Sequence, residues 1–292
     1  MSKRDDRLPG GRSLARGMAM LGLVLVILAA WSLPAQAEDD QARADRLFSE
    51  GLGLYQRQDF LGAQARWDEA LASYRKLGLE KEAAVTLGNL GNVAASMGEY
   101  EQAVSYEQEA LAACRKLHLE KDAARTLHNL GLIAERSNRY REALGYYQEA
   151  LAAFRQLGSA TLEPYILHSL GGVAADLTEY DQAITYYQQA LVLWRKLGRE
   201  EEAAKASQSL GRAAAALGRH QDALRYYDEA VVNWRRLGRK EETTVCEEDL
   251  GDAAAQVPRC ILRRSPPLQL CAVWVSRAGV GEGGGRRPWQ AG

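Results

Sequence analysis

The sequence lacks the motifs that mark most enzyme active sites. Its 292 residues contain no Gly-x-Ser-x-Gly elbow, no Gly-rich phosphate loop and no His-Glu-x-x-His pair. Nothing in it therefore predicts a serine hydrolase, a nucleotide-binding enzyme or a metalloprotease. The four histidines and four cysteines form no Cys-x-x-Cys or similar cluster, which leaves no ligand set for a metal ion. We expect no catalytic activity, no cofactor and no metal site.

Long apolar runs are also missing. One apolar run near the N-terminus extends only from Met18 to Leu33, whereas about 20 residues are needed for a helix that spans a bilayer. Basic residues precede this run and Ala35-Gln36-Ala37 follows it, a pattern typical of a secretory signal peptide. We expect residues 1–37 to be removed, so that the mature protein is periplasmic or secreted and has no integral membrane span. An uncleaved anchor is the alternative.

The C-terminal segment differs in composition from the rest of the chain. Residues 258–292 contain Pro266-Pro267, a run of three glycines and two arginine pairs, which is typical of a disordered tail. The change is abrupt enough that a truncated or frame-shifted gene is a second explanation. Cys260 and Cys271 could close a loop in this tail, but the pairing of four cysteines cannot be read from sequence.

A repeat with a period of about 40 residues organises the rest of the chain, and a fixed period of this length is typical of a solenoid, in which each repeat packs only on its neighbours. Such a fold offers a long surface for binding and no deep catalytic pocket. The period is marked by glycines at Gly51, Gly91, Gly131, Gly171, Gly211 and Gly251.

Each repeat is predicted to consist of two helices. Apolar residues from Leu87 to Ala94 fall three or four apart, as one face of a first helix requires, and a second helix follows from about Tyr100. Between the helices, Gly98, Asn138 and Gly218 are suited to the left-handed conformation that ends a helix. The predicted repeats cover residues 43–82, 83–122, 123–162, 163–202 and 203–242, and a capping helix covers 243–256.

Small residues are predicted to let paired helices pack closely. The repeat glycine on each first helix is matched by alanines on the second, and small side chains permit an approach of about 8–10 Å. Aromatic residues such as Trp67 and Tyr147 would fill the remaining space, although Glu107 takes one of these positions. Two alanine series carry the pattern: Ala63, Ala103, Ala143, Ala183 and Ala223, and then Ala70, Ala110, Ala150, Ala190 and Ala230.

These residues resemble the tetratricopeptide repeat, and the longer variant found here is similar to that of Pins-type adaptors and of kinesin light chain. The resemblance implies an all-α, right-handed solenoid of antiparallel helix pairs, with five full repeats and a capping helix. It also implies a non-enzymatic adaptor or scaffold. One alternative is the N-terminal regulatory fragment of a longer protein whose caspase-like protease domain is missing; another is a self-associating scaffold. The matching positions are Leu87, Leu90, Gly91, Ala94, Tyr100, Ala103 and Ala110.

The resemblance further implies a peptide-binding groove. In the family, first helices line a concave surface, and the residue two before the repeat glycine points into it. An Asn amide both donates and accepts hydrogen bonds, so it could pair with an extended peptide backbone. The alternative is that these Asn and Ser residues simply lie on a solvated helix surface. The candidate groove residues are Asn89, Asn92, Asn129, Ser169, Ser209, Arg125, His128, Arg136, Tyr165, His168, Lys205 and Arg212.

The distribution of charge narrows the class of partner. The whole chain carries −1, to which residues 1–37 contribute +3 and residues 258–292 contribute +5, leaving −9 on residues 38–257. Binding to nucleic acid needs a positive surface that neutralises phosphates. We therefore expect the repeats to bind a protein or an extended peptide and not a nucleic acid.

Overall fold

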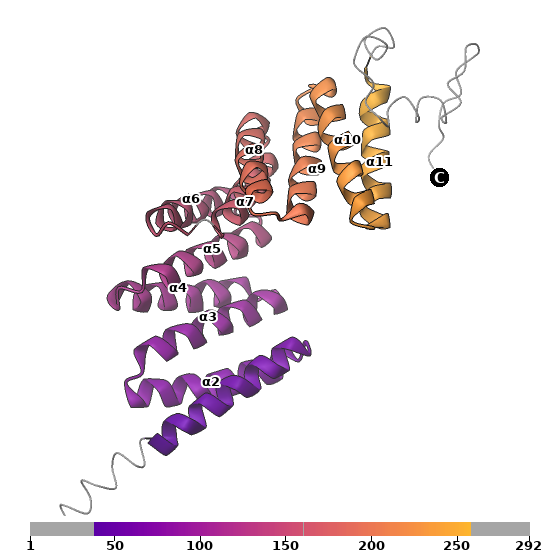
Figure 1. The fold of residues 1–292 in the computed structure, drawn as a ribbon. Helices are drawn as coiled ribbons and strands as arrows, with labels where there is room; N and C mark the ends of the chain where they lie inside the picture. Colours follow the sequence, from indigo (N-terminus) through magenta and orange to yellow (C-terminus); the bar gives the residue numbers. More distant parts are fainter. Residues whose placement is uncertain (1–37, 160, 258–292) are drawn as a thin grey trace, which may run out of the picture. The chain divides into compact units, whose positions relative to one another are not determined.

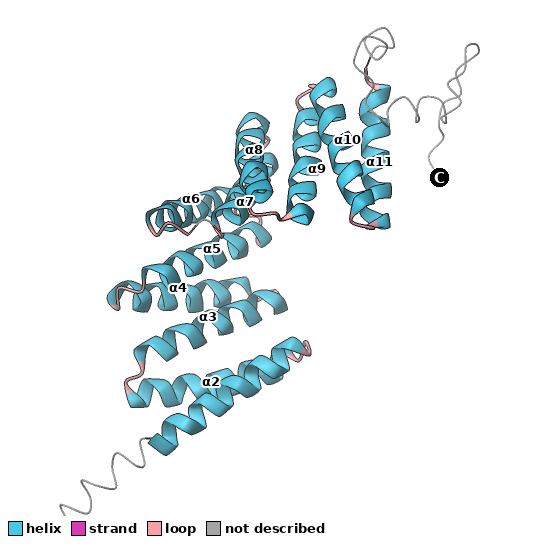
Figure 2. Cartoon of the chain, in the orientation of Figure 1, coloured by secondary structure: helices cyan, strands magenta, loops and turns pink. Residues whose placement is uncertain are grey.

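The computed structural model describes residues 38–159 and 161–257, which form helices joined by short turns (Figures 1 and 2). The predicted signal peptide and the predicted disordered tail lie outside these residues. The chain divides into two compact units between His118 and Leu119. Each unit is described by itself.

Unit 1 contains two helix pairs. Residues 38–56 are helical and precede the helices α2 (Phe60–Leu77), α3 (Glu80–Met97) and α4 (Tyr100–Lys116). The helix over residues 38–56 and α3 are the first helices of their pairs, and α2 and α4 are the second helices. Helices α3 and α4 pack along their length, as do α2 and α3.

Unit 2 continues the same alternation. Its first helices are α5, α7, α9 and α11, and its second helices are α6, α8 and α10, each packed on the helices next to it in sequence. Their bounds are α5 Glu120–Arg136, α6 Tyr140–Gln156, α7 Glu163–Asp176, α8 Tyr180–Lys196, α9 Glu200–Ala216, α10 His220–Arg236 and α11 Lys240–Ala255.

The turns inside the helix pairs use a residue with positive φ. Gly98, Asn138 and Gly218 have φ values of 82°, 59° and 73°, which confirms the left-handed conformation predicted for them. The turn after α3 is closed by the amide of Glu99, which donates to the carbonyl of Ala94 at 2.8 Å. Thr178 takes the same conformation with φ 62°, which the sequence did not indicate because β-branched residues rarely adopt it.

The first helices begin earlier than the sequence pattern indicated, with one exception. α3, α5, α9 and α11 start three residues before the predicted bounds, where acidic or polar residues extend the helix and the acidic ones favour its positive N-terminal end. α7 starts only at Glu163, with Pro164 in its first turn. A proline ring clashes with the carbonyl four residues before it, so α7 cannot begin a turn earlier.

The repeat glycines lie against large side chains of the second helices. A Cβ built on Gly131 would come within 2.4 Å of the Tyr147 ring, and one on Gly211 within 2.6 Å of the Tyr227 ring. Both tyrosine rings are buried. This confirms the close packing predicted from small residues. A glycine is required here because any larger residue would displace an aromatic ring.

The alanine series and the buried cysteines complete the core. All ten alanines of the two series are no more than 1% exposed, so they lie in the core as predicted. Glu107 is fully buried beneath Gly91, at the place where other repeats carry an aromatic ring. Cys114 and Cys246 are both buried thiols, whereas Cys260 and Cys271 lie outside the described residues.

Candidate functional site

Side chains from successive first helices meet on one surface of unit 2, which we call the first-helix face and define by α5, α7, α9 and α11. Ser209 Oγ on α9 lies 3.4 Å from His168 Nε2 on α7. Arg212 Nε on α9 donates to Asp249 Oδ2 on α11 at 3.0 Å. Ten of the twelve predicted site residues belong to this face, and Asn89 and Asn92 lie on α3 in unit 1.

The two predicted histidines pack against core tyrosines. The ring centroid of His128 is 5.6 Å from that of Tyr147, and the His168 centroid is 5.1 Å from that of Tyr187. Burial lowers the pKa of His128. Burial, and then the positive charge of Lys205, lower the pKa of His168 to about 4. Both imidazoles are therefore neutral at physiological pH and serve as aromatic packing partners.

The two predicted serines are tied to the same tyrosines. Burial is the main cause of the raised pKa of Tyr147, and a hydrogen bond from Ser169 opposes this rise. Burial likewise raises the pKa of Tyr187 to about 12, and a hydrogen bond from Ser209 opposes this rise. The serines are half-buried. They therefore link each first helix to the tyrosine of the preceding repeat and are not isolated groups on a wet surface.

The predicted basic residues are exposed, and most of them have acidic neighbours. Arg125 pairs with Asp122 at 2.9 Å, and Lys205 Nζ lies 2.9 Å from Glu201 Oε1. Arg136 lies close enough to Glu135 to lower its pKa against the effect of burial. Exposed ion pairs are worth at most about 1 kcal/mol, so a ligand could displace them at little cost.

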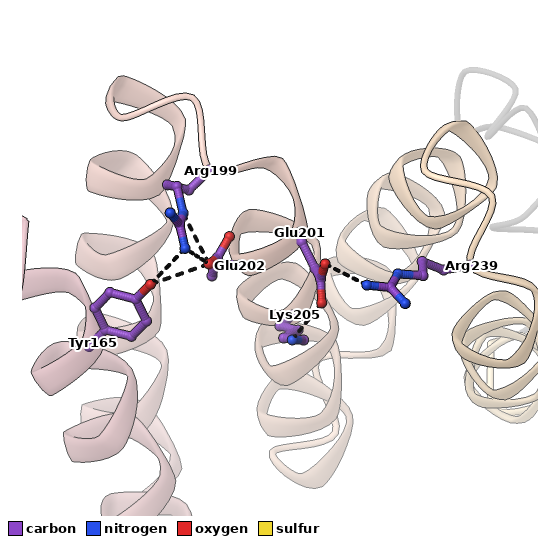
Figure 3. A network of polar contacts seen from close by, with 6 residues as sticks. All are labelled: Tyr165, Arg199, Glu201, Glu202, Lys205 and Arg239. Carbon is purple, nitrogen blue, oxygen red and sulfur yellow. Dashed lines mark hydrogen bonds and ion pairs between the residues drawn. The ribbon is translucent and has the colours of Figure 1, made fainter. Parts of the chain in front are cut away.

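Tyr165 joins a polar network at the start of α9 (Figure 3). Its hydroxyl accepts a hydrogen bond from Arg199 Nη2 at 2.9 Å and donates to Glu202 Oε1 at 3.3 Å. The neighbouring Glu201 accepts from Arg239 Nη2 at 2.9 Å. Figure 3 shows two groups of contacts at the beginning of α9: Arg199 and Glu202 contact Tyr165 on α7, and Glu201 contacts Arg239, which directly precedes α11. These exposed contacts join neighbouring repeats but contribute little stability, since each ion pair is worth at most about 1 kcal/mol.

The predicted asparagines are half-buried on their helices. Asn89 and Asn92 lie in the middle of α3 in unit 1, and Asn129 lies on α5 in unit 2. Asn89 and Asn129 each lie two residues before a repeat glycine, and Asn92 directly follows one. The use of these amides to hold a peptide backbone stays a prediction.

Two carboxylates and a glycine on the same face escaped the sequence analysis. Glu135 on α5 accepts a hydrogen bond from the Tyr147 hydroxyl at 2.7 Å, and its pKa is raised mainly by burial and further by Asp176. Gly172 lies beside Glu135, since a Cβ built on it would be 3.9 Å from Glu135 Oε1 and 3.8 Å from the Tyr187 hydroxyl. A signal was present: the positions equivalent to Glu135 at 95, 175, 215 and 255 are all Ala.

Each unit also has a cavity that the sequence did not predict. In unit 2 a space of about 340 Å³ lies between α7 and α8, beside Leu167 and Val192, next to the late start of α7. In unit 1 a space of about 240 Å³ opens between the helix over residues 38–56 and α3. The unit 1 cavity is lined by Asp45, Phe48, Tyr74, Lys81, Glu82 and Val85.

The described part of the chain shows neither a metal centre nor a membrane helix. Within residues 38–159 and 161–257, no three His, Cys, Asp or Glu side chains come together in a way that could hold a metal ion. The helices of those same residues are too short or too polar to cross a bilayer.

Comparison with known proteins identifies the repeat. A family model described as tetratricopeptide repeat matches residues 40–116, 82–156 and 163–256. No curated protein matches the chain.

Solved structures share the fold at low sequence identity. BtubC (BKLC) from P. vanneervenii is 20% identical with a TM-score of 0.62, over 70% of this chain and 91% of that one. A putative kinesin light chain from Podosopora anserina is 15% identical with a TM-score of 0.59, over 68% and 98%. A Rap protein complexed with Competence and Sporulation Factor is 17% identical with a TM-score of 0.57, over 80% and 67%. The predicted all-α solenoid of antiparallel helix pairs is confirmed, and the chain belongs to the tetratricopeptide repeat family.

Proposed function

We propose that this protein is a non-catalytic adaptor that binds an extended segment of a partner protein on the first-helix face of unit 2. Successive first helices present polar groups on this face at intervals of one repeat. Asn129 on α5, Ser169 on α7 and Ser209 on α9 occupy equivalent positions in three successive repeats. Such a series could follow the repeating donors and acceptors of an extended backbone.

The observation that carries the proposal is Gly172, a half-buried glycine on the first-helix face. A Cβ built there would make only ordinary contacts, with the Tyr187 hydroxyl at 3.8 Å and Glu135 Oε1 at 3.9 Å, so the missing side chain leaves a small opening. Glycine is favoured where another backbone must approach closely. Glu135 and the Tyr187 hydroxyl flank the opening and could bond to a peptide that enters it.

The contacts of the Ser209–His168 pair favour binding over catalysis. A serine beside a histidine resembles the nucleophile and base of a hydrolase, and the two atoms are 3.4 Å apart. However, the pKa of His168 is lowered to about 4, whereas an effective general base has a pKa near the working pH. This imidazole would accept a proton from a serine only poorly. The pair is better suited to holding α7 against α9.

Binding can be tested with a library of short random peptides displayed on phage and selected against the full chain. Leucine at position 172 should fill the opening without unfolding α7, since a Cβ at this position meets only ordinary contacts. The matched control is Gly145→Leu, because Gly145 is exposed on α6 and its Cβ would meet nothing within 4 Å.

Selected peptides, measured by titration calorimetry, should bind the wild type and the Gly145→Leu protein equally and the Gly172→Leu protein at least about tenfold more weakly, a loss of about 1.4 kcal/mol. Equal binding to the two variants would place the site elsewhere. Failure to select any binding peptide would contradict peptide binding itself.

We also propose that the protein is exported, on the basis of the basic, apolar and Ala-x-Ala pattern in residues 1–37. Intact-mass measurement of protein recovered from the periplasm or medium should give a chain that starts at Glu38. A mature species that still carries Met18–Leu33 would instead support a membrane anchor.

A further inference from the structure

The unit 1 cavity combines aromatic walls with an acidic rim. Phe48 and Val85 come from the two first helices of the unit, and Tyr74 comes from α2. The Tyr74 hydroxyl donates to Asp45 Oδ1 at 2.8 Å. Glu82 lies near the same phenol, because its charge, after burial and the effects of Asp45, helps to raise the Tyr74 pKa. The cavity is therefore lined by two carboxylates together with apolar and aromatic side chains.

The position of the cavity connects it with the surface predicted to bind peptides. Asp45 and Val85 are one repeat apart, and both occupy the register of the predicted groove residues Arg125, Tyr165 and Lys205. The cavity thus opens on the first-helix side of unit 1. Its volume of about 240 Å³ is below the roughly 300–1,000 Å³ of typical small-molecule sites. It is suited to one side chain of a larger ligand.

The charges of the lining residues identify the kind of side chain. Asp45 and Glu82 are acidic, and Lys81 is the one cation among the six lining residues, so the lining carries a net negative charge. Phe48 is half-buried and offers an aromatic ring, whose face attracts cations. An aliphatic stem can lie along Val85 while its charged head reaches the carboxylates. An acidic side chain would be repelled by the two carboxylates, and a purely apolar one would gain no attraction from them.

We propose that this cavity binds the arginine or lysine side chain of a peptide that lies on the first-helix side of unit 1. The inference rests on the proposed function, because the side chain belongs to a bound peptide, but it adds a specificity for basic residues. It predicts that peptides recognised by the protein share a cationic residue.

The cavity can be tested without any peptide. The probes are the Nα-acetylated amides of arginine, lysine, leucine and glutamate, titrated into the full chain while NMR follows the methyl groups of Val85. The arginine and lysine derivatives should give saturable shifts, and the leucine and glutamate derivatives should not. Binding of the leucine derivative as tightly as arginine would reduce the site to an apolar pocket. Preference for glutamate would show that Lys81 dominates, and no saturable shift with any probe would also overturn the inference.

Three variants separate charge from shape. The double change Asp45→Asn with Glu82→Gln keeps an acceptor for the Tyr74 hydroxyl, so the fold should survive. It should weaken the arginine derivative at least about tenfold, as expected when charge-assisted hydrogen bonds are lost. Lys81→Met should instead strengthen binding, because it removes a like charge. The control Glu101→Gln alters an exposed carboxylate on α4 and should change nothing.

These outcomes are independent of the test on unit 2. If the arginine derivative does not bind the unit 1 cavity while peptides still bind at Gly172, only the inference about the cavity is overturned. Weaker arginine binding by the Lys81→Met protein would contradict the assigned charge preference even if the cavity binds a ligand.

Discussion

Two neighbouring glycines on α7 should respond in opposite ways to alanine. A Cβ at Gly171 would lie 2.6 Å from Cδ1 and Cε1 of Tyr187 and 2.9 Å from its Cζ. These are the atoms of a buried ring that also packs against His168 at 5.1 Å between centroids, so the ring has little freedom to move away. A Cβ at Gly172 would meet its nearest atom at 3.8 Å, an ordinary contact.

The expected magnitudes follow from two opposing effects. Overpacking a core typically costs about 1–3 kcal/mol, whereas replacing glycine by alanine inside a helix stabilises by about 0.5–1 kcal/mol. At Gly171 the clash outweighs the gain, so Gly171→Ala should destabilise by about 1–2 kcal/mol. At Gly172 only the gain remains, so Gly172→Ala should stabilise by about 0.5–1 kcal/mol.

Urea unfolding followed by far-ultraviolet circular dichroism would measure both changes. The midpoint should fall for Gly171→Ala and rise for Gly172→Ala, with similar slopes, since the area exposed on unfolding hardly changes. Gly145→Ala, at an open position on α6, is the control for helix propensity alone and should also rise. A midpoint at or above wild type for Gly171→Ala would refute the argument that the tyrosine ring requires the glycine.

Three further predictions each test a single feature of unit 2. Thr178→Gly should raise the melting temperature, because Thr178 has φ 62° and a left-handed conformation costs an L-residue about 1–2 kcal/mol; Gly218→Thr at the equivalent turn should lower it. The pKa of His168 is lowered to about 4, so its contribution to stability is complete above about pH 6.5 and is lost as the pH falls toward 4. Urea midpoints of the wild type should therefore fall across that pH range, and those of the His168→Gln protein should fall less. Tyr147→Phe should raise the pKa of Glu135 in a carboxyl NMR titration, because the lost hydrogen bond opposes the effect of burial; an unchanged pKa would contradict the assigned contact.

The fold could be predicted because its determinants recur. A single glycine such as Gly131 says little, but the same glycine in every repeat, with Ala143 and Ala150 at fixed distances after it, defines a packing interface that each repeat uses again. Helix starts were less accurate because they depend on local end effects. Pro164 delays α7, whereas polar residues carry the other first helices further upstream than the apolar pattern indicated.

The candidate site was harder to predict because its chemistry depends on contacts between repeats. Sequence position placed Ser169 and Ser209 on the first-helix face, but it could not show that both reach the phenols of the preceding repeats. The serine–phenol contact depends on how closely adjacent repeats stack. For the same reason the sequence could not connect Glu135 with Asp176, which belong to successive repeats and interact in the structure.

Departures from the repeat are therefore the best guide to function in this chain. Positions that repeat faithfully are occupied by the residues that hold helices together, and selection for the solenoid alone would give every repeat the same residue there. Glu135 departs from a position that is Ala at 95, 175, 215 and 255, and it lies close to Gly172 on one face. Phe48 and Asp45 occupy positions that vary from repeat to repeat, and they line one cavity in unit 1. Packing of the helix pairs does not require Glu135, since residues 95, 175, 215 and 255 at the equivalent position are all Ala. Binding of a partner gives both groups of residues a physical reason, because a ligand needs an opening and a charge that the repeat itself does not supply.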